Sequence, residues 1–286
     1  MRIDLHAHST RSDGTRTPAE LVADARRAHL DAVAITDHDT TSGWLEATAA
    51  AHEHGITLVS GVEISCERDG RSVHLLGYLV DPSNTPLATE LAKARESRVT
   101  RLERMVARLA ADGIPVTYAA VLAKVPPGAT PGRPHIADAL VAAGAVATRD
   151  EAFARWLHDQ SPYYVHHYAP DPVRAVGLVQ AAGGVAVLAH PFTQTRGAGV
   201  LTDRAIGELA DAGLRGLEAD HPDHDAPARA RAHALAARLG LLVTGSSDYH
   251  GAGKTTRLGD NLTDPAALAA IEAQATGAAI VRPERR

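Results

Sequence analysis

The chain has 286 residues, of which 45% are apolar, and its formal net charge is −5. This length supports one large domain, or one domain with an insertion, and no apolar run is long enough to span a membrane. The negative net charge argues against a broad basic surface that binds long nucleic acid. The single cysteine, Cys66, excludes an intrachain disulfide, and without a signal-peptide pattern we expect a cytoplasmic protein.

Short apolar runs alternate with helical patterns over the first third of the chain. Strands are predicted over residues 2–8, 32–38, 56–65 and 72–80. Thr17-Pro18-Ala19-Glu20 predicts the start of a helix, because it combines a capping box with proline at the first helical position. A second helix is predicted over about 42–54. Strand–helix alternation indicates a parallel sheet or barrel.

The middle of the chain has a different character, with helix signals only between about residues 86 and 155. Alternation then resumes, with strands predicted over 184–191, 216–222 and 241–250 and a last helix from Asp264. The simplest interpretation is an α/β barrel formed by residues 1–89 and 169–286. An all-helical insertion, residues 90–168, interrupts it.

Metal-ligating side chains recur at the ends of the predicted strands, where functional residues of parallel barrels gather. One buried histidine is usually a hydrogen-bonded core residue, but a set of six histidines and three carboxylates is not explained in that way. We therefore predict a metal centre with several ions. The set comprises His6, His8, Asp13, His38, Glu63, His74, His190, Asp248 and His250.

Five motifs in order resemble the PHP (polymerase and histidinol phosphatase) family of metal-dependent phosphoesterases: HAHSTRSDGTRTPAEL, AITDHDT, GVEIS, VLAHP and GSSDYHG. GRPHIADAL and PYYV resemble the branch that acts on nucleoside 3′,5′-bisphosphates and short RNA 5′ ends. The resemblance implies a distorted (β/α)7 barrel, the PHP fold, that holds two to three divalent ions (Mn, Fe or Zn). Carried over by position, one ion is held by His6, His8, Glu63 and Asp248. Glu63 bridges to a second ion on His74 and His190, while Asp13, His38 and His250 hold the third.

Substrate contacts are predicted at three places. Arg133 and His135 fall in the first turn of a helix, where free N–H groups and a guanidinium favour a phosphate. Arg196 follows His190 in a glycine-rich loop and is expected to reach a second phosphate. His221 and His224 sit at a strand end, and either is a candidate proton donor to the leaving group.

These features predict a phosphoesterase in which a metal-bound hydroxide attacks a phosphate monoester. The expected substrate is a small phosphorylated molecule, a nucleotide or short oligonucleotide. The resemblance favours a nucleoside 3′,5′-bisphosphate such as the adenosine compound, converted to the 5′-monophosphate, with 5′-to-3′ trimming of short RNA as a second activity. One alternative is a phosphatase of histidinol phosphate or another small monoester. Another, of a different class, is a regulatory module that binds nucleotide or metal without catalysis.

Overall fold

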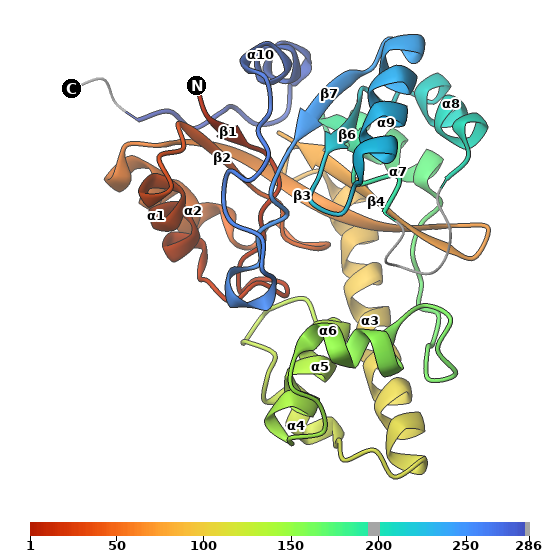
Figure 1. Cartoon of the computed structure of the whole chain (residues 1–286). Coiled ribbons are helices and arrows are strands. Elements are labelled where there is room, and N and C mark those ends of the chain that lie inside the picture. The colour runs from red at the N-terminus through yellow and green to blue at the C-terminus, as the bar shows by residue number, and fades with distance from the viewer. Residues whose placement is uncertain (194–200, 284–286) are drawn as a thin grey trace.

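The computed structural model describes residues 1–193 and 201–283, and within these ranges seven strands form one sheet in the order of the chain. The sheet curls into a nearly closed barrel (Figure 1). The strands are β1 (Ile3–Asp4), β2 (Ala32–Ile35), β3 (Thr57–Arg68), β4 (Arg71–Tyr78), β5 (Val185–Leu188), β6 (Gly216–Asp220) and β7 (Leu242–Gly245). A bridge between Ala7 and Tyr249 joins the chain after β1 to the chain after β7. The predicted PHP-type (β/α)7 barrel is confirmed.

One strand departs from the parallel arrangement that the alternation predicted. β4 runs antiparallel to both β3 and β5, while the other strand pairs are parallel. The cause is the two-residue turn Asp69-Gly70, in which both residues have positive φ (52° and 72°). Such a turn matches the twist of a β-hairpin, so the chain folds straight back instead of crossing over.

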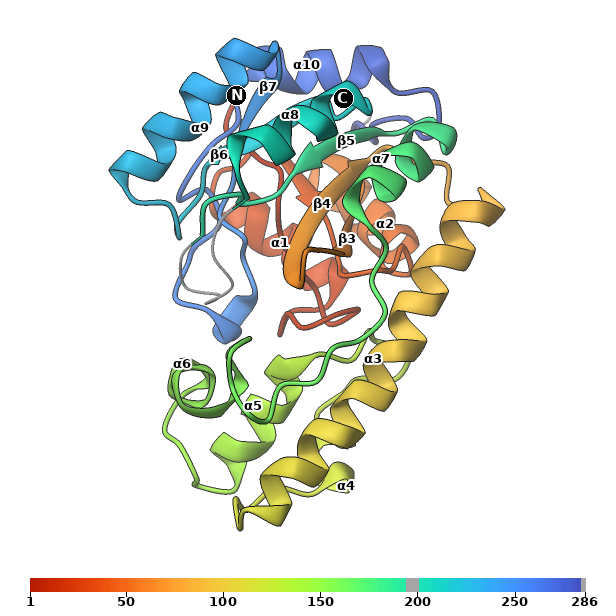
Figure 2. The same ribbon diagram turned by 90° about the vertical axis from the view of Figure 1, so that its right-hand side faces the viewer.

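Six helices cover the outside of the barrel (Figures 1 and 2). They are α1 (Pro18–Arg27), α2 (Trp44–His54), α7 (Pro172–Ala181), α8 (Asp203–Asp211), α9 (Ala226–Leu239) and α10 (Pro265–Gln274). The predicted capping box opens α1: the Thr17 hydroxyl accepts from the N–H of Glu20, and the Glu20 carboxylate accepts from the N–H of Thr17. A short 3₁₀ helix, η2 (Gly251–Gly253), follows β7.

The remaining helices form a separate body beside the barrel mouth (Figure 1). They are α3 (Thr85–Ala111), α4 (Tyr118–Leu122), α5 (Arg133–Ala142), α6 (Arg149–Ala152) and the π-helix η1 (Phe153–Leu157). α3 belongs to both parts, because Leu87 and Leu91 pack in the barrel core while Leu102 and Met105 pack in the core of the insertion. After η1 the chain runs back beside α3 to α7 (Figure 2).

Within the described residues, no helix combines the length and the apolar character that are needed to cross a membrane.

Candidate metal centre

All nine predicted ligands are buried and meet at the mouth of the barrel, although they come from six different segments of the chain. Within the described residues, donor atoms that lie within 4.8 Å of one another form three overlapping groups. The first group is His6, His8 and Asp248; the second is His38, Glu63 and His74; the third is His8, Asp13, His38 and His250.

The first group is held by the chain just after β1. His6 and His8 alternate along an extended segment, so both rings project to the same side, and their Nε2 atoms lie 3.0 Å apart. These Nε2 atoms are 3.5 and 3.4 Å from Oδ1 of Asp248, and 3.2 and 3.1 Å from Oε2 of Glu63. The four side chains therefore surround one point.

The antiparallel hairpin of β3 and β4 explains how Glu63 and His74 reach the mouth from within strands. His74 pairs with Ser65, two residues along β3 from Glu63, so both side chains lie on one face of the hairpin. Oε1 of Glu63 is 2.6 Å from Nδ1 of His74 and 3.1 Å from Nε2 of His190. Its other oxygen faces His6 and His8. This geometry fits a carboxylate that bridges two ions.

The third group lies on the opposite side of His8. Asp13 places one oxygen 3.3 Å from Nε2 of His250 and the other 3.8 Å from Nε2 of His38. The rings of His8 and His250 stack with centroids 4.1 Å apart. His8 and His38 each belong to two groups, whereas the motifs assign each of them to one ion. His190, which the motifs assign beside His74, belongs to none of the three groups.

The donor set and its unsatisfied atoms fit divalent metal ions. Imidazole nitrogen and carboxylate oxygen are the ligands that Zn, Mn and Fe share. Oδ1 of Asp13 and Nδ1 of His38 are buried and make no hydrogen bond, which a coordinated cation would compensate.

Electrostatics at the mouth favour ionised carboxylates. Burial acts to raise the pKa values of Asp13, Glu63 and Asp248, but the surrounding histidines, and Lys254 beside Asp248, hold all three well below their usual range. Burial acts to lower the pKa of His8, but hydrogen bonds from its ring to Asp248 and Glu63 raise it to about 9. A bound metal ion would replace the proton on His8 and supply the positive charge that the carboxylates now receive from it.

A carboxylate behind the ligands was missed by the sequence reasoning. Glu218 on β6 is fully buried, and its Oε1 lies 3.0 Å from Nδ1 of His6. Its Oε2 accepts a 2.9 Å hydrogen bond from the N–H of His190, and the hydroxyl of Ser246 donates to Oε1. The only signal was an acidic residue within the apolar run GLEAD. Glu218 leaves Nε2 of His6 free to bind metal.

A second missed carboxylate organises the loop that carries Asp13. Asp37 accepts hydrogen bonds from the N–H and the hydroxyl of Ser9, at 2.8 and 2.6 Å, and from the hydroxyl of Ser12 at 2.7 Å. The loop is thereby fixed against the end of β2. Asp37 stands beside His38 in the motif AITDHDT, and that position was its one sequence signal.

The two candidate proton donors have different surroundings. Nδ1 of His221 accepts from the N–H of Asp223, so the ring proton is on Nε2, which lies 3.4 Å from Oδ2 of Asp248 and makes no hydrogen bond. In His224, Nδ1 donates to the carbonyl of Ala219 and Nε2 accepts from the N–H of Phe192. Both nitrogens of His224 are thus used by the backbone.

Of the predicted substrate contacts, Arg133 and His135 make hydrogen bonds within the insertion. Nη1 of Arg133 donates to the carbonyl of Leu157 at 2.7 Å and to Asp159. His135 is buried, and its Nδ1 accepts from the N–H of Gly132, so it caps α5. Arg196 lies outside the described residues.

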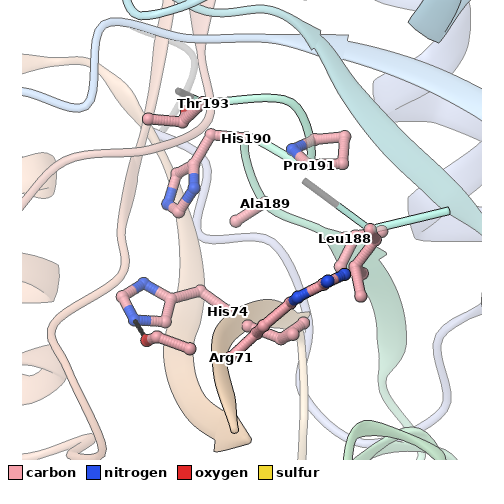
Figure 3. Close-up of a pocket in the computed structure, with 10 residues that line it drawn as sticks. Arg71, His74, Leu188, Ala189, His190, Pro191 and Thr193 are labelled. Atoms are coloured by element: carbon pink, nitrogen blue, oxygen red, sulfur yellow. Dashed lines mark hydrogen bonds between the residues drawn. The ribbon is translucent and has the colours of Figure 1, made fainter. Parts of the chain in front are cut away.

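A small cavity of about 30 Å³ opens beside two of the predicted ligands. Figure 3 shows the rings of His74 and His190 projecting to the same side, whereas the side chain of Arg71 extends the other way, toward Leu188. The two ring centroids are 5.3 Å apart. Arg71 thus lines the cavity with its guanidinium directed away from the two imidazoles.

Comparison with known proteins agrees with this architecture. Residues 4–117 match the model of the PHP domain. A 3′,5′-nucleoside bisphosphate phosphatase from Chromobacterium violaceum is 36% identical, with 89% of each chain covered. A 5′-3′ exoribonuclease from Haemophilus influenzae is 37% identical, over 67% of this chain and 69% of that protein. The crystal structure of a chain from Bifidobacterium adolescentis, described as a metal-dependent phosphoesterase, superposes with a TM-score of 0.93 at 44% identity and 96% coverage of both chains.

The barrel, its clustered donors and these relatives define a hydrolase of phosphoric esters that depends on metal ions. The chain belongs to the PHP family.

Proposed function

We propose that the protein hydrolyses nucleoside 3′,5′-bisphosphates, such as the adenosine compound, to the 5′-monophosphate and phosphate. The observation that carries the proposal is a nine-ligand donor set facing an insertion rich in arginine. The insertion contacts the metal centre directly, since Nη1 of Arg149 donates to the carbonyl of Asp13 at 3.2 Å. The relative from Chromobacterium violaceum supports this choice of substrate.

The metal ligands would fall into the three sets carried over from the family, with His8 contacting two of them. When bound, the two to three divalent ions (Mn, Fe or Zn) supply the hydroxide nucleophile and neutralise charge on the phosphoryl oxygens. Glu63 would help to hold two of these ions, because one of its oxygens faces His8 and the other faces His74. Glu218 and Asp37 hold the ligands in place.

We assign the proton donor to His221. Its Nε2–H has no backbone partner among the described residues and points into the metal centre, 3.4 Å from Oδ2 of Asp248, whereas both nitrogens of His224 are bound to the backbone. His221 would protonate the 3′ oxygen as the phosphate leaves.

A second substrate class is favoured by the exoribonuclease relative. Cleavage of a 5′ nucleotide from short RNA is also attack at phosphorus, and would use the same ligands and the same nucleophile. Histidinol phosphate and regulatory binding without turnover remain the alternatives to exclude.

One combined experiment tests the proposal. Purified protein is analysed for its metals, and then reloaded with Mn²⁺ after metal removal. Phosphate release is measured with bisphosphates, sugar phosphates, histidinol phosphate and 5′-phosphorylated oligonucleotides. Preferred turnover of bisphosphates supports the proposal. Equal turnover of histidinol phosphate contradicts the choice of substrate, and no turnover across the panel favours a binding module.

A further inference from the structure

Three arginines and a histidine meet where the insertion joins the barrel: Arg98 and Arg101 on α3, Arg133 on α5, and His167 on the chain after η1. These four residues are named the arginine group. Arg98 is paired with Asp39, its Nε 3.0 Å from Oδ2, and Arg133 is paired with Asp159.

Arg101 differs from Arg98 and Arg133 because it forms no ion pair with a carboxylate in the described part of the chain. Its side chain is only 6% exposed. Nε donates to the carbonyl of Val165 at 2.9 Å, but Nη2 is buried without any hydrogen bond. A buried guanidinium nitrogen with no acceptor is costly, and an anionic ligand would remove that cost.

His167 shows the same deficiency. Neither of its ring nitrogens has a hydrogen-bond partner among the residues that the structure describes. Burial and the positive charges of Arg98, Arg101 and Arg133 lower the pKa of His167 to about 2, so the ring is neutral. Like Arg133, His167 is partly exposed, and a neutral imidazole offers one N–H to an acceptor.

Aromatic packing fixes the two guanidinium groups relative to each other. The guanidinium carbons of Arg101 and Arg133 lie 4.7 and 5.1 Å from the ring centroid of Tyr164. Burial and the nearby positive charges of Arg133 and Arg98 lower the pKa of Arg101 to about 9. The three arginines and two carboxylates leave one uncompensated positive charge, with His167 neutral.

We propose that Arg101, Arg133 and His167 form a receptor for a tetrahedral oxyanion, and that it binds the substrate phosphate that is not hydrolysed. The role as a substrate subsite rests on the proposed function. Arg98 of the same group pairs with Asp39, which directly follows the predicted metal ligand His38, so the receptor lies on the side of the insertion that faces the metal centre. A phosphate there would receive N–H groups from two guanidinium forks and one imidazole.

Steady-state kinetics test the subsite. kcat/KM is measured for adenosine 3′,5′-bisphosphate and for adenosine 3′-monophosphate, which lacks the second phosphate. Arg101→Gln is expected to lower kcat/KM for the bisphosphate about 100-fold, the value of a hydrogen bond to a charged group, and for the monophosphate less than about 3-fold. An equal loss on both substrates overturns the subsite. The matched control is Arg104→Gln, an exposed arginine on the same helix, which should change neither value.

His167→Phe is the second variant, because Arg101 also holds the carbonyl of Val165 and its replacement can disturb folding. The nitrogens of His167 make no hydrogen bond that a phenyl ring would remove. A loss confined to the bisphosphate supports the receptor, and unchanged kinetics contradict a contact from His167.

A structural measurement separates the receptor from the proposed function. Crystals of the full chain, stripped of metal, are soaked in selenate, and the anomalous signal of selenium is located. We expect a peak within hydrogen-bond distance of Nη2 of Arg101 in the unchanged protein and none in Arg101→Gln. Absence of this peak overturns the receptor. A peak in a protein that does not hydrolyse bisphosphates refutes the proposed function and leaves the receptor standing.

Discussion

Oε1 of Glu218 lies 3.0 Å from Nδ1 of His6, and both side chains are fully buried. The carboxylate thereby selects the tautomer of His6 that leaves Nε2 for a metal ion. Glu218→Gln should lower metal affinity or kcat by about 10- to 100-fold, because an amide is a weaker partner for the imidazole N–H. Elemental analysis after dialysis and steady-state kinetics measure both. Glu103→Gln, an exposed position on α3, is the control, and equal behaviour of the two variants would contradict the role of Glu218.

Metal stoichiometry distinguishes the proposed ligand sets. His6→Asn and Asp13→Asn should each remove about one ion per chain, because the two residues belong to the ligand sets of different ions. The double variant should remove about two. His8→Asn should remove about two by itself, since His8 lies in two of the donor groups. The ions are counted by mass spectrometry of the purified variants. A double variant that loses no more metal than either single variant would show that His6 and Asp13 share one ion.

The role of His221 depends on the leaving group. His221→Gln should lower kcat for a nucleotide phosphate by about 100-fold or more, the contribution of a positioned general acid. With p-nitrophenyl phosphate, whose leaving group needs no proton, kcat should change little. His224→Gln serves as comparison: it should lower the melting temperature, because both ring nitrogens bind the backbone, without this dependence on the leaving group. If His221→Gln slows both substrates equally, His221 is not the proton donor.

The junction of insertion and barrel is expected to be a major source of stability. Asp39 accepts hydrogen bonds from the N–H of Ser65 at 2.8 Å and from Nε of Arg98 at 3.0 Å, and all three residues are buried. Asp39→Ala leaves a buried guanidinium without its partner and should lower the free energy of unfolding by about 3–5 kcal/mol. Urea denaturation measures the change. Glu272→Ala, which breaks an exposed pair with Arg282, should cost less than about 1 kcal/mol.

The sequence was informative about the barrel and the ligands because both follow a local rule. Parallel strands bring their carboxyl ends to one edge, so side chains after separate strands, such as His8, His38 and His190, meet without knowledge of the intervening helices. The capping box of α1 is equally local. β4 is the exception, because Asp69-Gly70 is a local hairpin signal that reverses the chain, whereas strand–helix alternation predicts a parallel strand.

Supporting contacts were beyond the sequence because they join distant segments. Glu218 and His6 are 212 residues apart, and their pairing depends on the stagger of β6 against the chain after β1. The roles of His221 and His224 could not be separated from the sequence either. They differ in which backbone N–H each ring binds: that of Asp223 for His221, and that of Phe192 for His224. Nor does any local pattern show that Arg101 forms no ion pair with a carboxylate of the described residues.

The length and stiffness of α3 bear on the spacing between the barrel and the insertion. It is one uninterrupted helix of 27 residues, about 40 Å long, with Leu87 in the barrel core and Leu109 in the core of the insertion. Arg98 and Arg101 lie in its middle, and a helix is much stiffer than a loop. The interval between the metal centre and these arginines is therefore a fixed length. If the proposed receptor binds the second phosphate, α3 would select substrates by the separation of their two phosphates.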